Sequence, residues 1–156
     1  MKAVVVVASN RAAAGVYADE TGPLIVQWLG EQGFDVGLPV VVHDGDPVAA
    51  AISAALADGA RVVLTTGGTG LTPTDRTPDV TRPLLDFEVP GIADAIRAHG
   101  LSGGIPTAML SRGLAGVAGS CLVVNLPGSR GGVKDGLSVL APVLRHAVEQ
   151  IVGSDH

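Results

Sequence analysis

The chain has 156 residues, which is enough for one domain with a substantial hydrophobic core. Its formal net charge is −5 and only 3% of its residues are aromatic, a composition that argues against a general nucleic-acid or anionic-membrane surface. The sequence has no run of about 18 apolar residues and a single cysteine, Cys121, so we expect one cytoplasmic domain over residues 1–156 without a membrane span or an intrachain disulfide.

The first strand and helix are clearly marked in the sequence. Residues 3–8 form a continuous, mostly β-branched run, which is typical of a strand buried on both faces of a parallel sheet. A polar loop over residues 9–15 follows. The next helix is expected to begin with Thr21 as its cap, to carry Pro23 in its first turn, and to end at Gly33.

A second strand, a helix and a third strand come next. Residues 36–42 predict a strand interrupted by glycine and proline. Asp46 and Pro47 are expected to be the N-cap and first residue of a helix, and Gly59 ends it. Residues 61–66 then form a third buried strand. This alternation of strands and helices predicts a doubly wound, mostly parallel sheet with right-handed crossovers.

The second half of the chain adds helices and a hairpin. We expect a short helix, a turn and a longer helix over residues 78–85, 87–91 and 91–101. Residues 114–126 predict a hairpin that supplies an antiparallel edge strand, and Cys121 within it is expected to be a small buried residue. Two helices over residues 133–140 and 142–152 close the fold. The predicted fold class is therefore a three-layer α/β/α sandwich.

The most distinctive stretch follows the third strand. Residues 65–72 contain three glycines and four threonines, whose bare N–H groups and hydroxyls are suited to holding an anion. This loop fits neither the P-loop nor the dinucleotide-binding pattern, so by itself it is equally well explained as a tight strand-to-helix connection. Three polar loops, 9–15, 43–46 and 66–79, are all expected beyond the carboxyl ends of the strands, where open α/β sheets bind ligands.

Four aspartates lie in these loops. Asp46 is explained as a helix cap, and Asp79 is explained as an acid favoured by the dipole of a helix N-terminus. Asp44, at a strand end, has no such structural explanation, and Asp75 has only that of a solvated acid in a loop. Carboxylates beside a phosphate cradle need a cation between them and the ligand, so we expect Asp44 and Asp75 to share a Mg²⁺ ion that also binds phosphoryl oxygens.

Other side chains are weaker candidates. Arg11, Arg112 and Arg130 follow or flank strand ends, where each is either a phosphate ligand or a member of a surface ion pair. The histidines show no metal-ligand spacing with one another or with Cys121, which argues against a zinc site. No serine lies in a Gly-x-Ser-x-Gly motif, which argues against a hydrolase of that type.

Taken together, several segments resemble the molybdenum-cofactor biosynthesis family of MogA- and MoaB-type proteins. The resemblance runs in order along nearly the whole chain. It is carried by Ser9-Asn10-Arg11 with Gly15-Val16-Tyr17 and Asp19, by Thr66-Gly67-Gly68-Thr69-Gly70-Leu71-Thr72-Pro73 to Asp75 with Thr77-Pro78-Asp79, by Glu88-Val89-Pro90-Gly91, by Ser111-Arg112, and by Asn125-Leu126-Pro127-Gly128-Ser129.

This resemblance implies an ATP- and Mg²⁺-dependent molybdopterin adenylyltransferase, in which the terminal phosphate of molybdopterin attacks the α-phosphate of ATP. The two acids that are essential in the family fall on Asp44 and Asp75, as catalytic and metal-binding residues. The implied substrate- and nucleotide-binding residues are Ser9, Arg11, Thr66, Gly67, Gly68, Thr69, Gly70, Ser111, Arg112, Asn125, Pro127, Gly128 and Ser129. Family members typically form homotrimers, or hexamers in the MoaB branch.

Two positions depart from the family pattern. Asn10 stands where an acid is usual, which would lower Mg²⁺ affinity if that acid were a ligand. Thr74 stands where arginine is common, with Arg76 displaced by two positions. Both departures bear on efficiency more than on identity. The short length of the chain resembles the MoaB-like branch, some of whose members bind without adenylylating, so the alternative function is a MoaB-like protein that binds or carries molybdopterin without adenylyl transfer. A nicotinamide-dependent dehydrogenase is poorly supported, because no acidic residue follows a Gly-x-Gly-x-x-Gly motif at about 20 residues.

Overall fold

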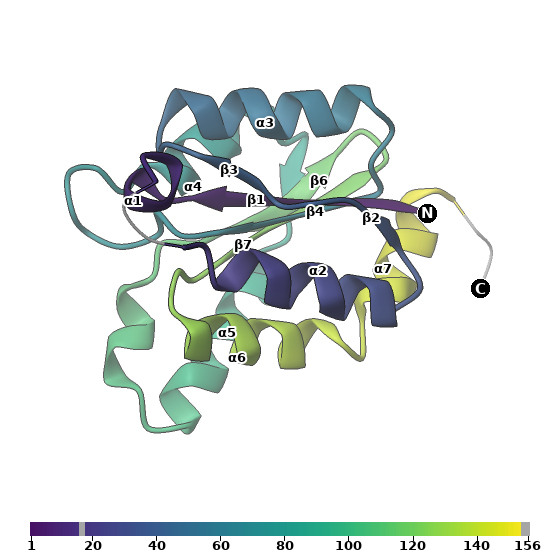
Figure 1. The fold of residues 1–156 in the computed structure, drawn as a ribbon. Helices are drawn as coiled ribbons and strands as arrows, with labels where there is room; N and C mark the ends of the chain where they lie inside the picture. Colours follow the sequence, from purple (N-terminus) through teal and green to yellow (C-terminus); the bar gives the residue numbers. More distant parts are fainter. Residues whose placement is uncertain (16–17, 154–156) are drawn as a thin grey trace.

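A computed structural model of the chain describes residues 1–15 and 18–153. These residues form a seven-stranded sheet with helices on both faces, the three-layer sandwich expected from the sequence (Figure 1). The strands run in the order β2-β1-β4-β7-β6-β5, and β3 pairs with β1 alongside β2. Their bounds are β1 Lys2–Ala8, β2 Asp35–Val36, β3 Val40–Val42, β4 Val62–Thr66, β5 Phe87–Glu88, β6 Ala115–Ala118 and β7 Cys121–Leu126.

Most of the sheet is parallel. At one side β6 runs antiparallel to β7, and β5 runs antiparallel to β6. The expected hairpin is confirmed as β6 and β7, and β7 in turn pairs in parallel with β4. The prediction of a turn over residues 87–91 is wrong for Phe87 and Glu88. These two residues form β5, which pairs antiparallel with β6 and is the outermost strand on that side. The split in the second predicted strand is confirmed as two short strands, β2 and β3.

The helices cover both faces of the sheet. They are α1 Asn10–Ala13, α2 Thr21–Glu31, α3 Asp46–Ala57, α4 Thr77–Thr81, α5 Pro90–Ser102, α6 Arg130–Leu140 and α7 Leu144–Ile151, with 3-10 helices η1 Arg82–Leu84 and η2 Pro106–Leu110. Figure 1 shows α3 on one side of the sheet and α2, α5 and α6 on the other. None of the described helices is long and apolar enough to cross a membrane.

The strand residues alternate between two hydrophobic clusters because successive side chains point to opposite faces. Val5 and Val7 of β1 belong to the cluster that includes α2, α6 and α7, whereas Val6 and Ala8 belong to the cluster under α3. Cys121 lies buried in this second cluster, as expected, and burial raises the pKa of its thiol to about 12. A continuous β-branched run therefore did indicate a strand covered on both faces.

Three predictions about helix starts need correction. The loop over residues 9–15 contains one helical turn, α1, whose first N–H groups are capped by Ser9. Val16 and Tyr17, which follow it, lie outside the described residues. The N-cap residue of α2 is Glu20 rather than Thr21, and Asp19 accepts the N–H of Gly22 in the first turn at 3.0 Å. The N-cap of α3 is Gly45, with φ of 93°, and Asp46 lies exposed in the first turn.

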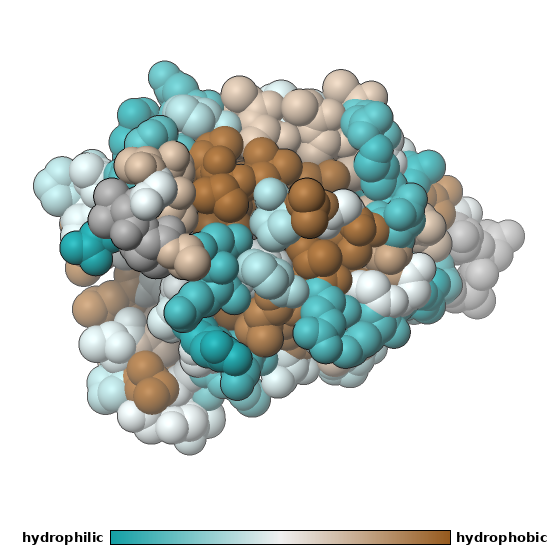
Figure 2. Space-filling view, in the orientation of Figure 1, coloured by the Kyte–Doolittle hydropathy of each residue, from teal (hydrophilic) through white to brown (hydrophobic). Residues whose placement is uncertain are grey.

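The face of the molecule drawn in Figure 2 carries a pronounced hydrophobic band. Figure 2 shows it over the sheet edge formed by β2 and β3, between α2 and α3. Leu38, in the connection between these strands, is 89% exposed, and Val40 is 40% exposed.

Candidate functional site

The parallel strands end in register at one edge of the sheet. Val7 of β1 is opposite Thr66 of β4, Thr66 is opposite Leu126 of β7, and Ala8 is opposite Val42 of β3. The residues that follow these strand ends are therefore neighbours. The structure thus brings together the three predicted loops, which follow β1, β3 and β4, and adds the loop that begins at residue 127 after β7. In Figure 1 this edge lies on the side of α1, away from both chain ends.

The glycine-rich loop passes so close to its neighbours that two of its glycines cannot carry a side chain. Gly67 has φ of 91° and Gly68 has φ of 68°, values that favour glycine. A Cβ atom at Gly67 would collide with the carbonyl oxygen of Ala8. A Cβ atom at Gly68 would collide with Oδ2 of Asp44 and Oγ1 of Thr77. These glycines are needed for close approach, and not only for a turn.

Asp44 lies between β3 and the start of α3 and reaches across to the glycine-rich loop. Its Oδ1 accepts hydrogen bonds from the backbone N–H of Gly45 at 2.7 Å and of Arg76 at 3.2 Å. Its own N–H donates to Oδ1 of Asn10 at 3.0 Å. Burial raises the pKa of Asp44, and the charge of Asp75 adds to this effect, while the two backbone hydrogen bonds oppose it.

Asp75 is held by its own loop. Its Oδ2 accepts the N–H of Thr72 at 3.1 Å and the hydroxyl of Thr72 at 2.7 Å. Because Asp44 bonds to the N–H of Arg76, which follows Asp75, the two candidate acids lie in one neighbourhood. In each acid one carboxylate oxygen is anchored by these bonds, and the other has no hydrogen bond within residues 1–15 and 18–153.

Arg112 packs against the same loop. Its Nε donates to the carbonyl oxygen of Gly70 at 3.1 Å, and its Nη2 donates to the carbonyl oxygen of Asp75 at 2.7 Å. The guanidinium also forms a two-point ion pair with Asp79 at 3.0 and 3.1 Å. Its hydrogen bonds to Asp79 lower the pKa of that carboxyl and raise the pKa of Arg112.

Asn125 lies in the core and not on a cavity wall. It is 3% exposed, and its Oδ1 accepts the N–H of Leu114 at 3.2 Å. Its Nδ2 donates to the hydroxyls of Thr65 at 2.9 Å and Thr81 at 3.2 Å. The side chain thus ties β7 to β4 and α4 beneath the site.

Two cavities open at this edge of the sheet. The larger has a volume of about 910 Å³ and the smaller about 330 Å³. Gly128 lines both of them, and its backbone packs against Gly67. Thr66 fixes this contact, because its hydroxyl donates to the carbonyl oxygen of Pro127 at 2.7 Å. The two cavities are therefore separated by two glycine backbones.

The structure distributes the predicted binding residues over these cavities. The larger cavity is lined by Gly68, Thr69, Gly70, Asp75, Ser111, Pro127, Gly128 and Ser129. The smaller is lined by Ser9, Thr66, Gly67 and Gly128. Neither is lined by Arg11, Asp44, Arg112 or Asn125, and Arg11 is exposed on α1. Ser129 also caps α6 by accepting the N–H of Gly132 at 3.0 Å.

Sequence reasoning missed one whole wall of the larger cavity. That wall comes from α5, η2 and α6, and includes Ile96, Arg97, Ile105, Ala108 and Asp135. The apolar residues among them have the spacing of ordinary core residues, so nothing in the sequence marked them. Asp19, Glu20 and Arg130 line the smaller cavity, and only Arg130 had been considered as a phosphate ligand.

A metal ion at this site would need ligands from the substrate. Within residues 1–15 and 18–153 no group of three or more His, Cys, Asp or Glu side chains is arranged to hold a metal. Mg²⁺ commonly binds through one or two carboxylates, several waters and substrate phosphates. The unbonded oxygens of Asp44 and Asp75 fit that mode of binding.

Comparison with known proteins gives consistent matches over the whole fold. Residues 4–146 match the family described as the probable molybdopterin binding domain. The chain is 35% identical over 153 residues to the molybdopterin adenylyltransferase of Pyrococcus furiosus, covering 93% of this chain and 90% of that protein. The Mog protein from Mycobacterium ulcerans has a similar structure, with a TM-score of 0.92 and 53% identity, covering 96% of this chain and 98% of that one.

Other relatives are longer proteins. The chain is 41% identical over 155 residues to the molybdenum cofactor biosynthesis bifunctional protein of Synechococcus elongatus, covering 99% of this chain and 48% of that protein. The chain therefore spans about half the length of the bifunctional relatives it matches.

Proposed function

The chain belongs to the molybdopterin binding domain family, and from this membership we propose that it is a molybdopterin adenylyltransferase that uses ATP and Mg²⁺. Its relatives support a role in molybdenum cofactor biosynthesis. In the proposed reaction an oxygen of the terminal phosphate of molybdopterin attacks the α-phosphorus of ATP. The bond from that phosphorus to the β-phosphate oxygen breaks, so that pyrophosphate leaves and adenylylated molybdopterin forms.

The larger cavity is the observation that carries this proposal. Its volume of about 910 Å³ lies within the range of small-molecule sites, roughly 300–1,000 Å³. One side of it is made of backbone amides and hydroxyls from the glycine-rich loop and the start of α6, and the opposite side carries apolar residues such as Ile96 and Ile105. A ligand that carries both phosphates and a ring system fits such a cavity, because its phosphates can contact the polar wall while its ring contacts the apolar residues.

The glycine-rich loop supplies the phosphate contacts in this proposal. Gly68, Thr69 and Gly70 all line the larger cavity. In the described part of the chain their three N–H groups have no hydrogen-bond acceptor, although the loop carbonyls are engaged. Successive unbonded N–H groups form an anion-binding concavity, and Ser129 places the N-terminus of α6 beside it.

Asp44 and Asp75 are the residues that we propose hold Mg²⁺, through the carboxylate oxygen that each leaves unbonded. The ion would supply charge stabilisation on the phosphoryl oxygens and the departing pyrophosphate. The protein residues do the positioning. Thr72 orients Asp75, while Gly45 and the N–H of Arg76 orient Asp44.

The test is release of pyrophosphate from ATP in the presence of molybdopterin and Mg²⁺. Asp75→Asn keeps the acceptor for Thr72 but removes the charge, so we expect turnover to fall by about 100-fold or more without loss of the fold. Asp46→Asn is the matched control, because Asp46 is exposed in the first turn of α3, and its turnover should stay at the wild-type level.

The same assay separates the two functions left open by the sequence. A wild-type protein that makes no adenylylated molybdopterin would contradict the transferase. Asn10 and Thr74, the two departures from the family pattern, keep the carrier function open as the alternative. A carrier should bind molybdopterin with the same calorimetric affinity whether or not ATP is present, and replacing Asp44 should not weaken that binding.

A further inference from the structure

We propose that Arg112 is a positioning residue that holds the glycine-rich loop and Asp75 in their working geometry, and that it is not a phosphate ligand. Its effect on turnover rests on the proposed adenylyl transfer. The sequence alone had left both roles open for this arginine.

Arg112 binds the loop at three backbone positions. Its own N–H donates to the carbonyl oxygen of Thr69 at 2.8 Å. Its side chain then donates to the carbonyl oxygens of Gly70 at 3.1 Å and Asp75 at 2.7 Å. The loop from Thr69 to Asp75 is therefore folded around a single residue that lies about forty positions later in the chain.

The guanidinium has little capacity left for a ligand. It carries five N–H donors. One is on Nε and bonds to Gly70, two are on Nη2 and bond to Asp75 and Asp79, and one on Nη1 bonds to Asp79. One donor remains. A phosphate could bind this group at two points only by displacing Asp79 or a loop carbonyl, and Arg112 does not line either cavity.

The segment that carries Arg112 is itself anchored to the far wall of the larger cavity. Arg97 of α5 donates from Nη1 to the carbonyl oxygens of Ser111 at 3.1 Å and Gly113 at 2.8 Å. These two residues flank Arg112. The two arginines thus connect α5 to the glycine-rich loop, and they join two walls of the cavity that are far apart in the sequence.

Lysine cannot reproduce this arrangement. The planar fork of arginine donates in fixed directions to two carbonyl oxygens and a carboxylate at once, whereas an ammonium group is a compact point charge. Arg112→Lys therefore keeps the positive charge, which a phosphate would still attract, and loses the geometry that holds the loop. This difference separates the two roles.

The kinetic test compares Arg112→Lys with the wild type in the pyrophosphate assay. We expect kcat to fall by about 100-fold because the Asp75 carboxylate is displaced, and Arg112→Gln, which also removes the charge, should lose about as much. A KM for ATP that rises tenfold or more with kcat retained, on the order of a lost phosphate contact, would show a phosphate ligand and overturn the proposal.

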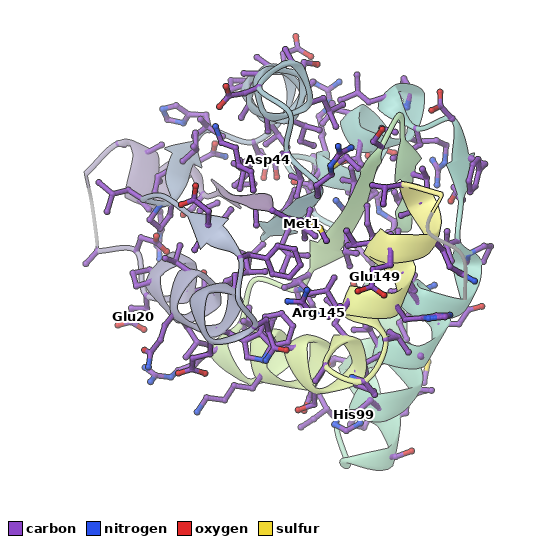
Figure 3. The ribbon with its side chains drawn as sticks, turned by 90° about the vertical axis from the view of Figure 1, so that its right-hand side faces the viewer. Met1, Glu20, Asp44, His99, Arg145 and Glu149 are labelled. Atoms are coloured by element: carbon purple, nitrogen blue, oxygen red, sulfur yellow. The ribbon has the colours of Figure 1, made fainter. Side chains whose placement is uncertain are left out.

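Arg145→Lys is the matched control. Arg145 also donates to a backbone carbonyl, that of Gln32 at 2.7 Å, but it lies on α7 at the opposite end of the molecule, which faces the viewer in Figure 3. Both kinetic constants should be unchanged in this variant. If kcat falls as far as in Arg112→Lys, the effect is a general loss of stability and the proposal is wrong.

A second measurement does not depend on turnover. The N–H of Asp75 bonds to the carbonyl oxygen of Thr72, and that of Thr77 bonds to the carbonyl oxygen of Gly68. In Arg112→Gln we expect these two amides to exchange hydrogen at least about tenfold faster, with the core strand β4 unchanged. Unchanged exchange in the loop would overturn the proposal. A wild type without transferase activity would contradict only the proposed function, because this exchange measurement would still decide the role of Arg112.

Discussion

At the scale of single residues, Asp44 combines a proposed role in holding Mg²⁺ with an unfavourable position for a charge. Burial raises its pKa, so the ionised form costs stability in the folded protein. The neutral amide of Asp44→Asn keeps an acceptor for Gly45 and Arg76. We expect this variant to lose transferase turnover and to gain about 0.5 kcal/mol in free energy of unfolding at pH 7, a small value because solvent screens a half-exposed group.

The pH dependence of that gain follows from the sign of the shift. An acid with a raised pKa stabilises the fold below its unfolded pKa, and this contribution is lost as pH rises through the folded value. The difference between Asp44→Asn and wild type should therefore disappear below pH 3.8, the usual pKa of this carboxyl. Denaturant titrations at several pH values measure this difference in the free energy of unfolding. A variant that is less stable than wild type at pH 7 would contradict the prediction.

The sequence predicted that two acids would lie together at this edge of the sheet, but it did not predict their surroundings. Asp44 and Asp75 could be chosen because no local role explained them, and the structure places both beside the same loop. The ground for setting Asp46 aside was wrong, since Gly45 occupies the cap position. The role of Arg112 could not be read from sequence, because its partners Gly70 and Asp75 are brought to it only by the tertiary fold.

At the scale of elements, the close packing of α5 on η2 forms the outer wall of the larger cavity. Gly100 makes this packing possible, since a Cβ atom there would lie 2.6 Å from Cβ of Ala108. Gly100→Ala should push η2 away from α5 and cost about 1–3 kcal/mol of stability, as overpacked sites do. We expect KM for ATP or for molybdopterin, whichever substrate occupies this cavity, to rise as well, because Gly100 and Ala108 line it.

Gly91→Ala in the same helix is the control for this change. A Cβ atom at Gly91 meets no atom within 4 Å, so alanine there should be neutral or stabilise the helix by up to about 1 kcal/mol. Thermal unfolding and the pyrophosphate assay measure both variants. If Gly100→Ala and Gly91→Ala change the stability and KM equally, the contact of Gly100 with η2 does not contribute to either.

The elements that the sequence predicted well have long, regular patterns. The buried strands β1, β4 and β7 are nearly continuous runs of apolar residues, because both faces of the sheet are covered. By contrast, β5 has only two residues, both exposed, and it exists because β6 offers a partner. A strand defined by its neighbour leaves no pattern of its own.

At the scale of the whole molecule, we propose a single molybdopterin-binding domain over residues 1–156 that assembles as a homotrimer. The hydrophobic band over the β2–β3 edge is the surface that we expect an assembly to bury, because Leu38 is 89% exposed there (Figure 2). Leu38→Lys should shift the mass measured by light scattering towards the monomer. Val152→Lys, at a residue 40% exposed after α7, is the control. An oligomer unaffected by Leu38→Lys would place the interface elsewhere.

The order of strands in the sheet has a consequence for how the protein is made. During synthesis β1 and β4 leave the ribosome well before β7, which pairs with the edge of β4 that faces away from β1. Until β7 arrives, β4 presents an unpaired, apolar edge of the kind that promotes aggregation. The ligand-binding edge needs all three strands, so nascent chains that end before Cys121 contain the glycine-rich loop but cannot assemble the site. Protection of the growing chain by chaperones therefore matters most over the interval between the emergence of β4 and that of β7.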